Sequence, residues 1–294
     1  MTAVDAGSEI VRLSVAGLEL ALDARGGGID MALPACSAKF LAGGLPDGGL
    51  MLNVRAGPLR QTGTWRPLYA PAEAWGLWLD EMARYVVVAA RLWPPGRQVT
   101  VDAGFTTGEV LVQLEDRTSQ PAPFYPLQSI DILLFANWLA GSGDLILHAS
   151  GVEVDGRGYC FAGASGAGKS TLAAALLGAP GVTVLGEDNL VLRWLAGQFW
   201  IFGTPWHLDP ARCSPAGAPL AKLFFLDRTA AAGVRPCAPA DGIARLLQTA
   251  FIPYYRPEAV ARIVDNLARL AERVPFYTLS YRLGSDPMDL LRDA

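Results

Sequence analysis

The residues best suited to chemistry lie in one short stretch, GASGAGKST at positions 163–171. A glycine, four further residues, and then Gly168, Lys169 and Ser170 match the spacing of a phosphate-binding P-loop. In such a loop the backbone N–H groups converge on phosphate oxygens, and the following helix adds positive potential at its N-terminus. Lys169 is suited to contact the β- and γ-phosphates, and the Ser170 hydroxyl to bind Mg²⁺. We therefore predict a triphosphate site made of Gly163, Ala164, Ser165, Gly166, Ala167, Gly168, Lys169, Ser170 and Thr171.

Lysine is scarce in this chain, with 3 lysines against 21 arginines. One of the three lysines is Lys169, inside the glycine-rich loop. There a slim, flexible ammonium can reach between phosphate oxygens, whereas a planar guanidinium does not fit in the same way. The choice of lysine at this position therefore favours phosphate binding.

A second group of candidates lies near the loop in sequence. Glu187 and Asp188 follow a short apolar run, and at a strand end one acid can bind the metal while the other faces an acceptor. His148 ends the run LILH, where an imidazole could pair with a carboxylate and help it take a proton from a hydroxyl. Trp206 and His207 could border the nucleotide or acceptor, and the sequence does not decide between that role and a structural one.

Two regions must position these residues. Residues from about 10 to 120 are rich in short β-like runs, and VRLSVAGLELALD alternates in the manner of one half-buried strand. The proline-rich stretch at 119–126 indicates a domain edge. We predict a β-rich N-terminal domain over residues 1–122 and a P-loop domain over 123–294.

The loop itself is expected to follow a β-hairpin. The stretch LILHASGVEVDGRGYCFAG predicts two strands joined by a tight turn at Asp155-Gly156, the second leading into the loop. We expect the strand near 145–148 to lie antiparallel to the one near 158–162, because the connection is too short for a crossover helix. The sheet that carries the loop should therefore be mixed. Beyond it, PEAVARIVDNLARLAERV predicts an amphipathic helix.

Composition excludes several classes of protein. With 51% hydrophobic residues the chain can bury a sizeable core, and its net charge of -4, without a basic run, argues against nucleic-acid binding. No apolar run is long enough to span a membrane, and the first residues lack the pattern of a signal peptide. Four separated cysteines are expected to be reduced thiols rather than metal ligands. We expect a cytoplasmic protein.

The run LHASGVEVDGRGYCFAGASGAGKSTLAAALL, followed by GEDNLVLR and GTPW, resembles the bacterial HPr serine kinase/phosphorylase-like group. The catalytic domain of that group is related in fold to phosphoenolpyruvate carboxykinase. The resemblance covers roughly residues 126 to 290, and the preceding region is similar to the β-rich part of uncharacterised HPr-kinase-like proteins. It implies an α/β P-loop kinase domain with a mixed sheet, preceded by a β-rich N-terminal domain.

The resemblance also implies roles. The catalytic histidine of the group falls on His148, its general base on Glu187 and its Mg²⁺ ligand on Asp188, with ATP and Mg²⁺ as cofactors. The group usually has aspartate where this chain has Glu187. The arginine- and glycine-containing segment with which true HPr kinases engage HPr is not evident, which argues against HPr as the acceptor and against phosphorylase activity.

We therefore expect an ATP-dependent kinase that phosphorylates a hydroxyl, with a serine of a protein or peptide as the acceptor. A nucleotide-binding regulator without transfer activity and a small-molecule kinase are the alternatives. The sequence leaves open the acceptor, the phosphate donor and the oligomeric state, a homo-oligomer included.

Overall fold

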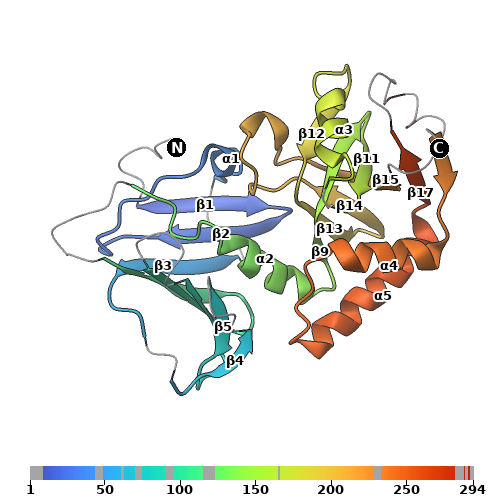
Figure 1. The fold of residues 1–294 in the computed structure, drawn as a ribbon. Helices are drawn as coiled ribbons and strands as arrows, with labels where there is room; N and C mark the ends of the chain where they lie inside the picture. Colours follow the sequence, from blue (N-terminus) through green and yellow to red (C-terminus); the bar gives the residue numbers. More distant parts are fainter. Residues whose placement is uncertain are drawn as a thin grey trace. The chain divides into compact units, whose positions relative to one another are not determined.

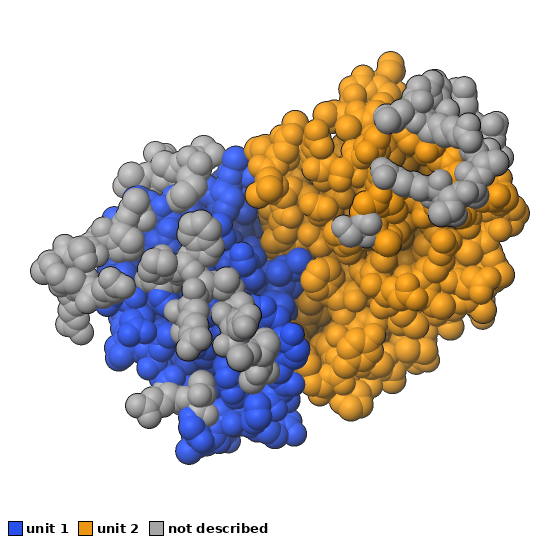
Figure 2. All heavy atoms as spheres, viewed as in Figure 1, with its two compact units in different colours: residues 1–133 blue, residues 134–294 orange. Residues whose placement is uncertain are grey.

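The computed structural model describes residues 9–43, 49–60, 63–69, 75–89, 96–114, 123–164, 166–227 and 233–281, together with Met288 and Leu291. The chain divides into two compact units, residues 1–133 and 134–294 (Figure 2). Each unit contains one mixed β-sheet, so the protein is of the mixed α/β class. Within the described ranges, no helix is both long and apolar enough to cross a lipid bilayer.

The first unit contains an eight-stranded sheet in the order β1-β2-β3-β8-β7-β6-β5-β4. Figure 1 labels its strands β1 to β5. Strand β3 pairs in parallel with β2 and β8, and the other neighbours are antiparallel. The elements are β1 (Ile10–Val15), β2 (Leu18–Asp23), α1 (Ala35–Ala38), β3 (Leu50–Ala56), β4 (Arg66–Tyr69), β5 (Gly76–Leu79), β6 (Tyr85–Ala89), β7 (Gly96–Val101) and β8 (Thr107–Gln113).

The prediction of a single strand across VRLSVAGLELALD is wrong. This stretch forms the two antiparallel strands β1 and β2, joined by a turn at Ala16-Gly17. Both turn residues have positive φ, 54° and 76°, as the tight turns that match the twist of a hairpin require. Alternating hydrophobicity continues across such a short turn, so the pattern alone did not reveal the reversal.

The second unit contains a nine-stranded sheet, in which seven strands follow the order β12-β10-β11-β15-β14-β13-β9, with β17 beside β15 and β16 beside β17. Its strands are β9 (Leu145–Leu147), β10 (Ala149–Val154), β11 (Arg157–Ala162), β12 (Val182–Gly186), β13 (Leu190–Leu195), β14 (Gln198–Phe202), β15 (Gly217–Leu226), β16 (Gly233–Pro236) and β17 (Phe276–Ser280). The helices are α2 (Asp131–Ala140), which begins in the first unit, α3 (Lys169–Leu176), α4 (Pro239–Thr249) and α5 (Pro257–Arg273), with a 3₁₀ turn at Pro210–Arg212.

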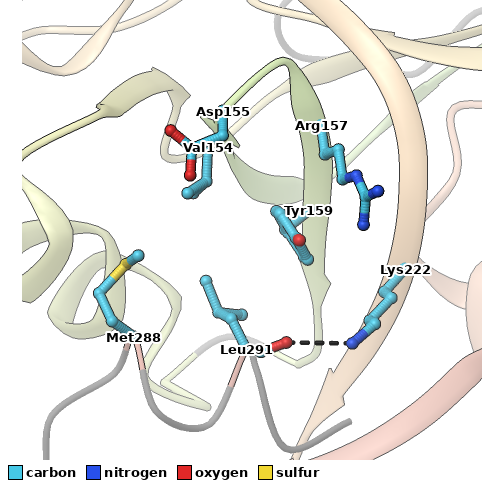
Figure 3. Close-up of a pocket in the computed structure, with 7 residues that line it drawn as sticks. All are labelled: Val154, Asp155, Arg157, Tyr159, Lys222, Met288 and Leu291. Atoms are coloured by element: carbon cyan, nitrogen blue, oxygen red, sulfur yellow. Dashed lines mark hydrogen bonds between the residues drawn. The ribbon is translucent and has the colours of Figure 1, made fainter.

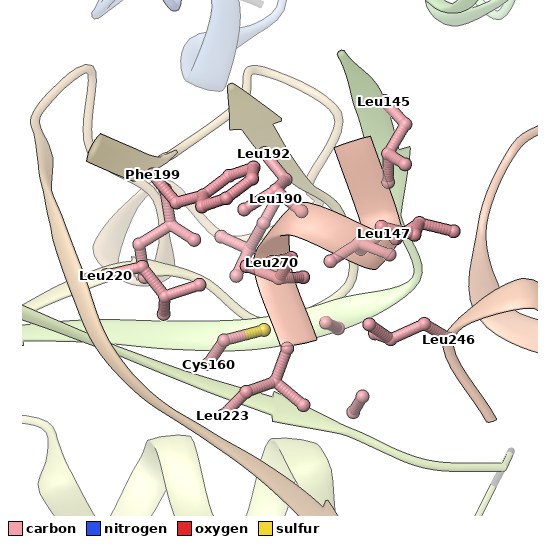
Figure 4. Packing of buried hydrophobic residues seen from close by; sticks show 14 of the residues in the cluster. Leu145, Leu147, Cys160, Leu190, Leu192, Phe199, Leu220, Leu223, Leu246 and Leu270 are labelled. Atoms are coloured by element: carbon pink, nitrogen blue, oxygen red, sulfur yellow. The ribbon is translucent and has the colours of Figure 1, made fainter. Parts of the chain in front are cut away.

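The second unit buries both faces of this sheet. Along β11, Cys160 belongs to one apolar cluster and Phe161 to the other, and along β15 Phe225 and Phe224 divide in the same way. The first cluster lies between the sheet and helices α4 and α5 (Figure 4), and the second contains the apolar side of α3. This alternation follows from the two-residue period of a strand. Strand β11 is therefore held from both sides directly before the loop.

The predicted hairpin is confirmed, with a correction to its first strand. Strands β10 and β11 are antiparallel and are joined at Asp155-Gly156, and β11 is parallel to β15, so the sheet is mixed as expected. The run LILH does not pair with β11, because β9 instead pairs with β13. The chain bends at residue 148, between β9 and β10. Strand β10, the antiparallel partner of β11, therefore begins only at Ala149.

A substitution at the turn tests this hairpin. Asp155 and Gly156 have φ values of 49° and 79°, and a Cβ at Gly156 would meet no atom within 4 Å. Gly156→Ala should therefore destabilise the fold by backbone strain alone, by about 1 kcal/mol. Urea unfolding would measure this loss. The same substitution at the exposed Gly43, whose φ is not positive and where a Cβ would also meet no atom within 4 Å, is the control, and equal stability of Gly156→Ala and the wild type would contradict the turn.

Candidate functional site

The glycine-rich loop leads from the end of β11 into the N-terminus of α3. Gly166 and Gly168 have φ values of 78° and 106°, in the region that favours glycine, and Gly168 caps the N-terminus of α3. The Ala167 N–H donates to the Ala164 carbonyl at 3.0 Å, which closes the loop into a turn. Ser165 lies outside the described residues. Ser170 is exposed in the first turn of α3, where its hydroxyl is accessible to a cation.

Lys169 is turned into the loop. Its side chain is buried, and its Nζ donates to the carbonyl oxygens of Gly163 at 2.8 Å and Ala164 at 3.2 Å. An ammonium has three N–H donors, so one remains for an anion such as a phosphate oxygen. Burial lowers the pKa of Lys169, and the Asp188 carboxylate acts in the opposite direction. This lysine and the acid 19 positions further along the chain are therefore close enough to interact.

The two acids lie in the turn between β12 and β13. The register of β10 brings this turn to the loop, because Gly151 pairs with Gly186 while Ala149 pairs with Ala162. Asp188 is exposed at the turn, and its charge acts on both Lys169 and His207. The Asp188 carboxylate and the Ser170 hydroxyl, on segments that meet at the same end of the sheet, are oxygen donors of the kind that Mg²⁺ prefers. The residues at this site therefore fit a Mg²⁺-bound triphosphate.

Glu187, the neighbouring acid, has a different environment. Its Oε2 atom accepts a hydrogen bond from Nη1 of Arg212 at 2.9 Å, and Arg212 also lies 3.3 Å from a carboxylate oxygen of Asp209. In the part of the chain that the structure describes, no hydrogen bond joins Glu187 to His148. The carboxylate of Glu187 is therefore held by an arginine rather than by the histidine expected from the sequence.

His148 lies at the bend between β9 and β10. Its backbone N–H donates to the Thr249 carbonyl at 2.7 Å, and its side chain is half-buried. Since Ala149 pairs with Ala162, the register of the hairpin places residue 148 opposite Gly163, the first residue of the loop. The backbone thus brings His148 to the end of the sheet where the loop begins, and its catalytic role stays a prediction.

The segment after β14 packs on the acidic turn. Thr204 is buried, and its Oγ1 donates to the Asn189 carbonyl at 2.8 Å. Nε2 of His207 lies 3.2 Å from the same Oγ1. A Cβ on Gly186 would come within 2.8 Å of that nitrogen, so only glycine leaves room for the imidazole. Trp206 packs edge-on against Phe135 of α2, which is a structural contact.

Burial governs the charge of His207. It lowers the pKa of the imidazole to about 4, against the opposing effects of the Asp188 carboxylate and the Asn189 carbonyl. The ring is therefore neutral near pH 7, and a neutral imidazole can donate through one nitrogen and accept through the other.

Other expected features of the chain are also located. All four cysteines are free thiols, and burial raises the pKa of Cys160 to about 12. The described residues contain no group of three or more histidine, cysteine or acidic side chains that could hold a metal ion. A cavity of about 430 Å³ opens at the turn end of the β10–β11 hairpin, away from the loop (Figure 3). It is lined by Val154, Asp155, Arg157, Tyr159, Lys222, Met288 and Leu291.

Comparison with known families matches residues 110–285 to the family described as SynChlorMet cassette protein ScmC. The chain belongs to this family. The matched residues include the loop, the acidic turn and the segment that packs on it. No curated protein matches this chain. A search of solved structures found similarity to the Hpr(Ser) kinase/phosphatase from Coxiella burnetii, at 16% identity and a TM-score of 0.29, covering 50% of this chain and 88% of that chain.

Two residues of the site were not singled out from the sequence. Arg212 is one of 21 scattered arginines, and nothing in its surroundings marked it as the partner of Glu187. Thr204 had one signal, its position between a glycine and a proline after a strand, but that pattern also suits an ordinary turn. Both contacts depend on the fold, because 15 and 25 positions separate the partners.

The burial of a neutral His207 predicts an acid-sensitive fold. Unfolding restores the ordinary pKa of 6.5, so below that pH the unfolded chain binds a proton that the folded chain excludes until about pH 4. The free energy of unfolding should therefore fall as pH drops from about 6.5 to about 4, by about 1–3 kcal/mol. Urea unfolding in EDTA across this range would measure it. His207→Gln should show a smaller fall, and an equal fall in both proteins would contradict this origin.

Proposed function

We propose that this protein is an ATP-dependent kinase that transfers the γ-phosphate of ATP to a hydroxyl group. The observation that carries the proposal is the register of β10, which brings the loop that contains Lys169 and the turn that contains Asp188 to the same end of the sheet. These two residues supply the two charges that a P-loop kinase needs, one for the phosphates and one for the cation. They come from separate elements, and the Asp188 carboxylate raises the pKa of Lys169 against the larger, opposite effect of burial.

Binding of the nucleotide uses groups that the site already orients. The N–H groups of the loop and of the first turn of α3 would hold the phosphate oxygens, and Lys169 would add the charge-assisted contact. Ser170 and Asp188 would hold Mg²⁺, which neutralises charge on the phosphates when bound. Because these groups are arranged before the nucleotide binds, they need little reorganisation during transfer.

Glu187 would orient the acceptor hydroxyl and take its proton, with His148 nearby. The Arg212 guanidinium donates to Oε2 of Glu187 and so fixes the position of the carboxylate. Phosphoryl transfer through a loose transition state requires more positioning than proton abstraction, so a carboxylate held in the right place is sufficient.

The acceptor that we propose is a serine of a protein or peptide rather than HPr. The family description names a cassette protein, and we expect the acceptor among the products of the same cassette. One observation favours a second function, a nucleotide-binding regulator without transfer activity. The Glu187 carboxylate is ion-paired with Arg212, and a stable pair would withhold it from an acceptor.

A pair of lysine substitutions tests nucleotide binding. Lys169→Ala removes the ammonium from the loop, whereas Lys222→Ala removes one from the wall of the distant cavity. Titration calorimetry with Mg-ATP should show at least a tenfold loss of affinity for Lys169→Ala, since a charge-assisted contact contributes about 1.5–3 kcal/mol. Lys222→Ala should bind like the wild type. Equal affinity of the two variants, both folded by circular dichroism, would contradict the P-loop assignment.

Transfer is tested separately from binding. Radiolabelled ATP is incubated with the wild type, with Lys169→Ala and with each peptide or protein encoded beside the gene. Label on a serine of one acceptor, absent with Lys169→Ala, supports the kinase. Tight Mg-ATP binding with no labelled acceptor favours the regulator instead.

A further inference from the structure

Arg212 uses only part of its hydrogen-bonding capacity where it holds Glu187. Its Nη1 atom donates to Oε2 of Glu187 at 2.9 Å, and its Nε atom lies 3.3 Å from Oδ2 of Asp209. Within the described part of the chain, Nη2 of Arg212 and Oε1 of Glu187 form no hydrogen bond, and neither atom is buried. A guanidinium has five N–H donors, and an ionised carboxylate accepts at both oxygens. This ion pair therefore presents one unused nitrogen and one unused oxygen to solvent.

The backbone holds Arg212 in this position. The Asp209 carboxylate accepts from the Ala211 N–H at 2.9 Å, and the Asp209 carbonyl accepts from the Arg212 N–H at 3.0 Å, which closes the 3₁₀ turn. Directly after that turn, the Ser214 N–H donates to the Leu185 carbonyl of β12. The Arg212 side chain, 33% exposed, is thus fixed at its base against the acidic turn, while its far end reaches the surface.

The charges around Arg212 explain why a cation is needed there. Glu187 and Asp188 lie in the acidic turn, and Asp209 lies beside the guanidinium, so three carboxylates would repel an approaching phosphate. Arg212 forms ion pairs with two of the three. Its positive charge therefore lowers the electrostatic barrier to an anion at Glu187.

We propose that Arg212 is a catalytic residue whose Nη2 atom donates hydrogen bonds to the phosphoryl group during transfer. This inference rests on the proposed function, in which Glu187 orients the acceptor hydroxyl. A hydroxyl oxygen bound to Oε1 lies about 2.7 Å from that atom. The phosphorus that it attacks lies about 3–3.5 Å further on. The guanidinium bound to the other oxygen of the same carboxylate is the cationic donor next to that position.

The transfer step divides the work of this ion pair between its two free atoms. The hydroxyl oxygen forms a bond to the γ-phosphorus while the bond from phosphorus to the bridging oxygen of ADP breaks, and ADP keeps that electron pair. Glu187 takes the hydroxyl proton at Oε1. Negative charge on the remaining phosphoryl oxygens is what Nη2 of Arg212 would stabilise, because a guanidinium matches the geometry of phosphate oxygens. Since Nη1 stays on Glu187, one side chain positions the carboxylate and contacts the phosphoryl group.

Two substitutions separate this contact from a structural role. Arg212→Gln removes the charge, whereas Arg212→Lys keeps a charge that can pair with Glu187 but has no second nitrogen. The control is Arg25→Gln, which removes an arginine from an ion pair with Asp23 in the first unit. Titration calorimetry with Mg²⁺ measures two ligands, a non-hydrolysable ATP analogue and ADP with fluoroaluminate, which mimics the phosphoryl group in transfer. Thermal unfolding is measured on the same samples.

We expect both Arg212 variants to bind ADP with fluoroaluminate about 10–100-fold more weakly than the wild type, because a charge-assisted hydrogen bond is lost. Their affinity for the ATP analogue should change much less, since the contact strengthens during transfer. Arg25→Gln should bind both ligands like the wild type. If Arg212→Gln does not fold, Arg212→Lys carries the test.

Full fluoroaluminate affinity in Arg212→Lys would overturn the inference, because it would show that only the charge beside Glu187 matters. An equal loss for both ligands would overturn it too, since Arg212 would then contribute only to ground-state binding. A wild type that binds the ATP analogue but gains no affinity for ADP from fluoroaluminate would also contradict it. A wild type that binds neither ligand would instead refute the proposed function.

Discussion

The site depends on the pairing of one strand, β10, with neighbours on both of its sides. Its antiparallel register with β11 sets Ala149 opposite Ala162, so the chain before β10 and the loop after β11 meet at the same end of the sheet. On its other side, Gly151 pairs with Gly186, which brings the acidic turn to that end as well. A slip of one residue would exchange the faces of the strand and expose its buried side chains, so burial on both faces enforces this register.

A second segment, residues 203–214, also holds the acidic turn, through contacts with residues directly before it and within it. The Ser214 N–H donates to the Leu185 carbonyl at 3.0 Å, directly before the turn, and Gly203 approaches the same carbonyl so closely that a Cβ would overlap it. Thr204 and Arg212 hold the residues on either side of Asp188. Asp188 is consequently an exposed carboxylate between two residues that are both held by hydrogen bonds, which suits the cation-binding role that we propose for it.

Short sequence motifs made part of the fold and of the candidate site predictable from the sequence. The glycine loop, the Asp155-Gly156 turn and the amphipathic helix α5 each have a signal within a few residues, and the structure contains all three. The pairing of β9 with β13 and the contact of Glu187 with Arg212 have no such signal, because they join distant segments whose meeting is decided by the whole sheet. The position of His207 against Gly186 is of the same kind, which is why its role could not be decided from the sequence.

Hydrogen–deuterium exchange with and without Mg²⁺ and a non-hydrolysable ATP analogue tests most directly whether the loop and the acidic turn form one nucleotide site. Bound phosphates should slow exchange of backbone amides at residues 163–172, which donate to them, and the cation should slow exchange at residues 186–190. Amides around the distant cavity, at residues 154–159, should not change. Slower exchange in both segments, dependent on Mg²⁺ at the turn, is the predicted result. Unchanged exchange at the loop, or protection confined to the cavity, would contradict the account.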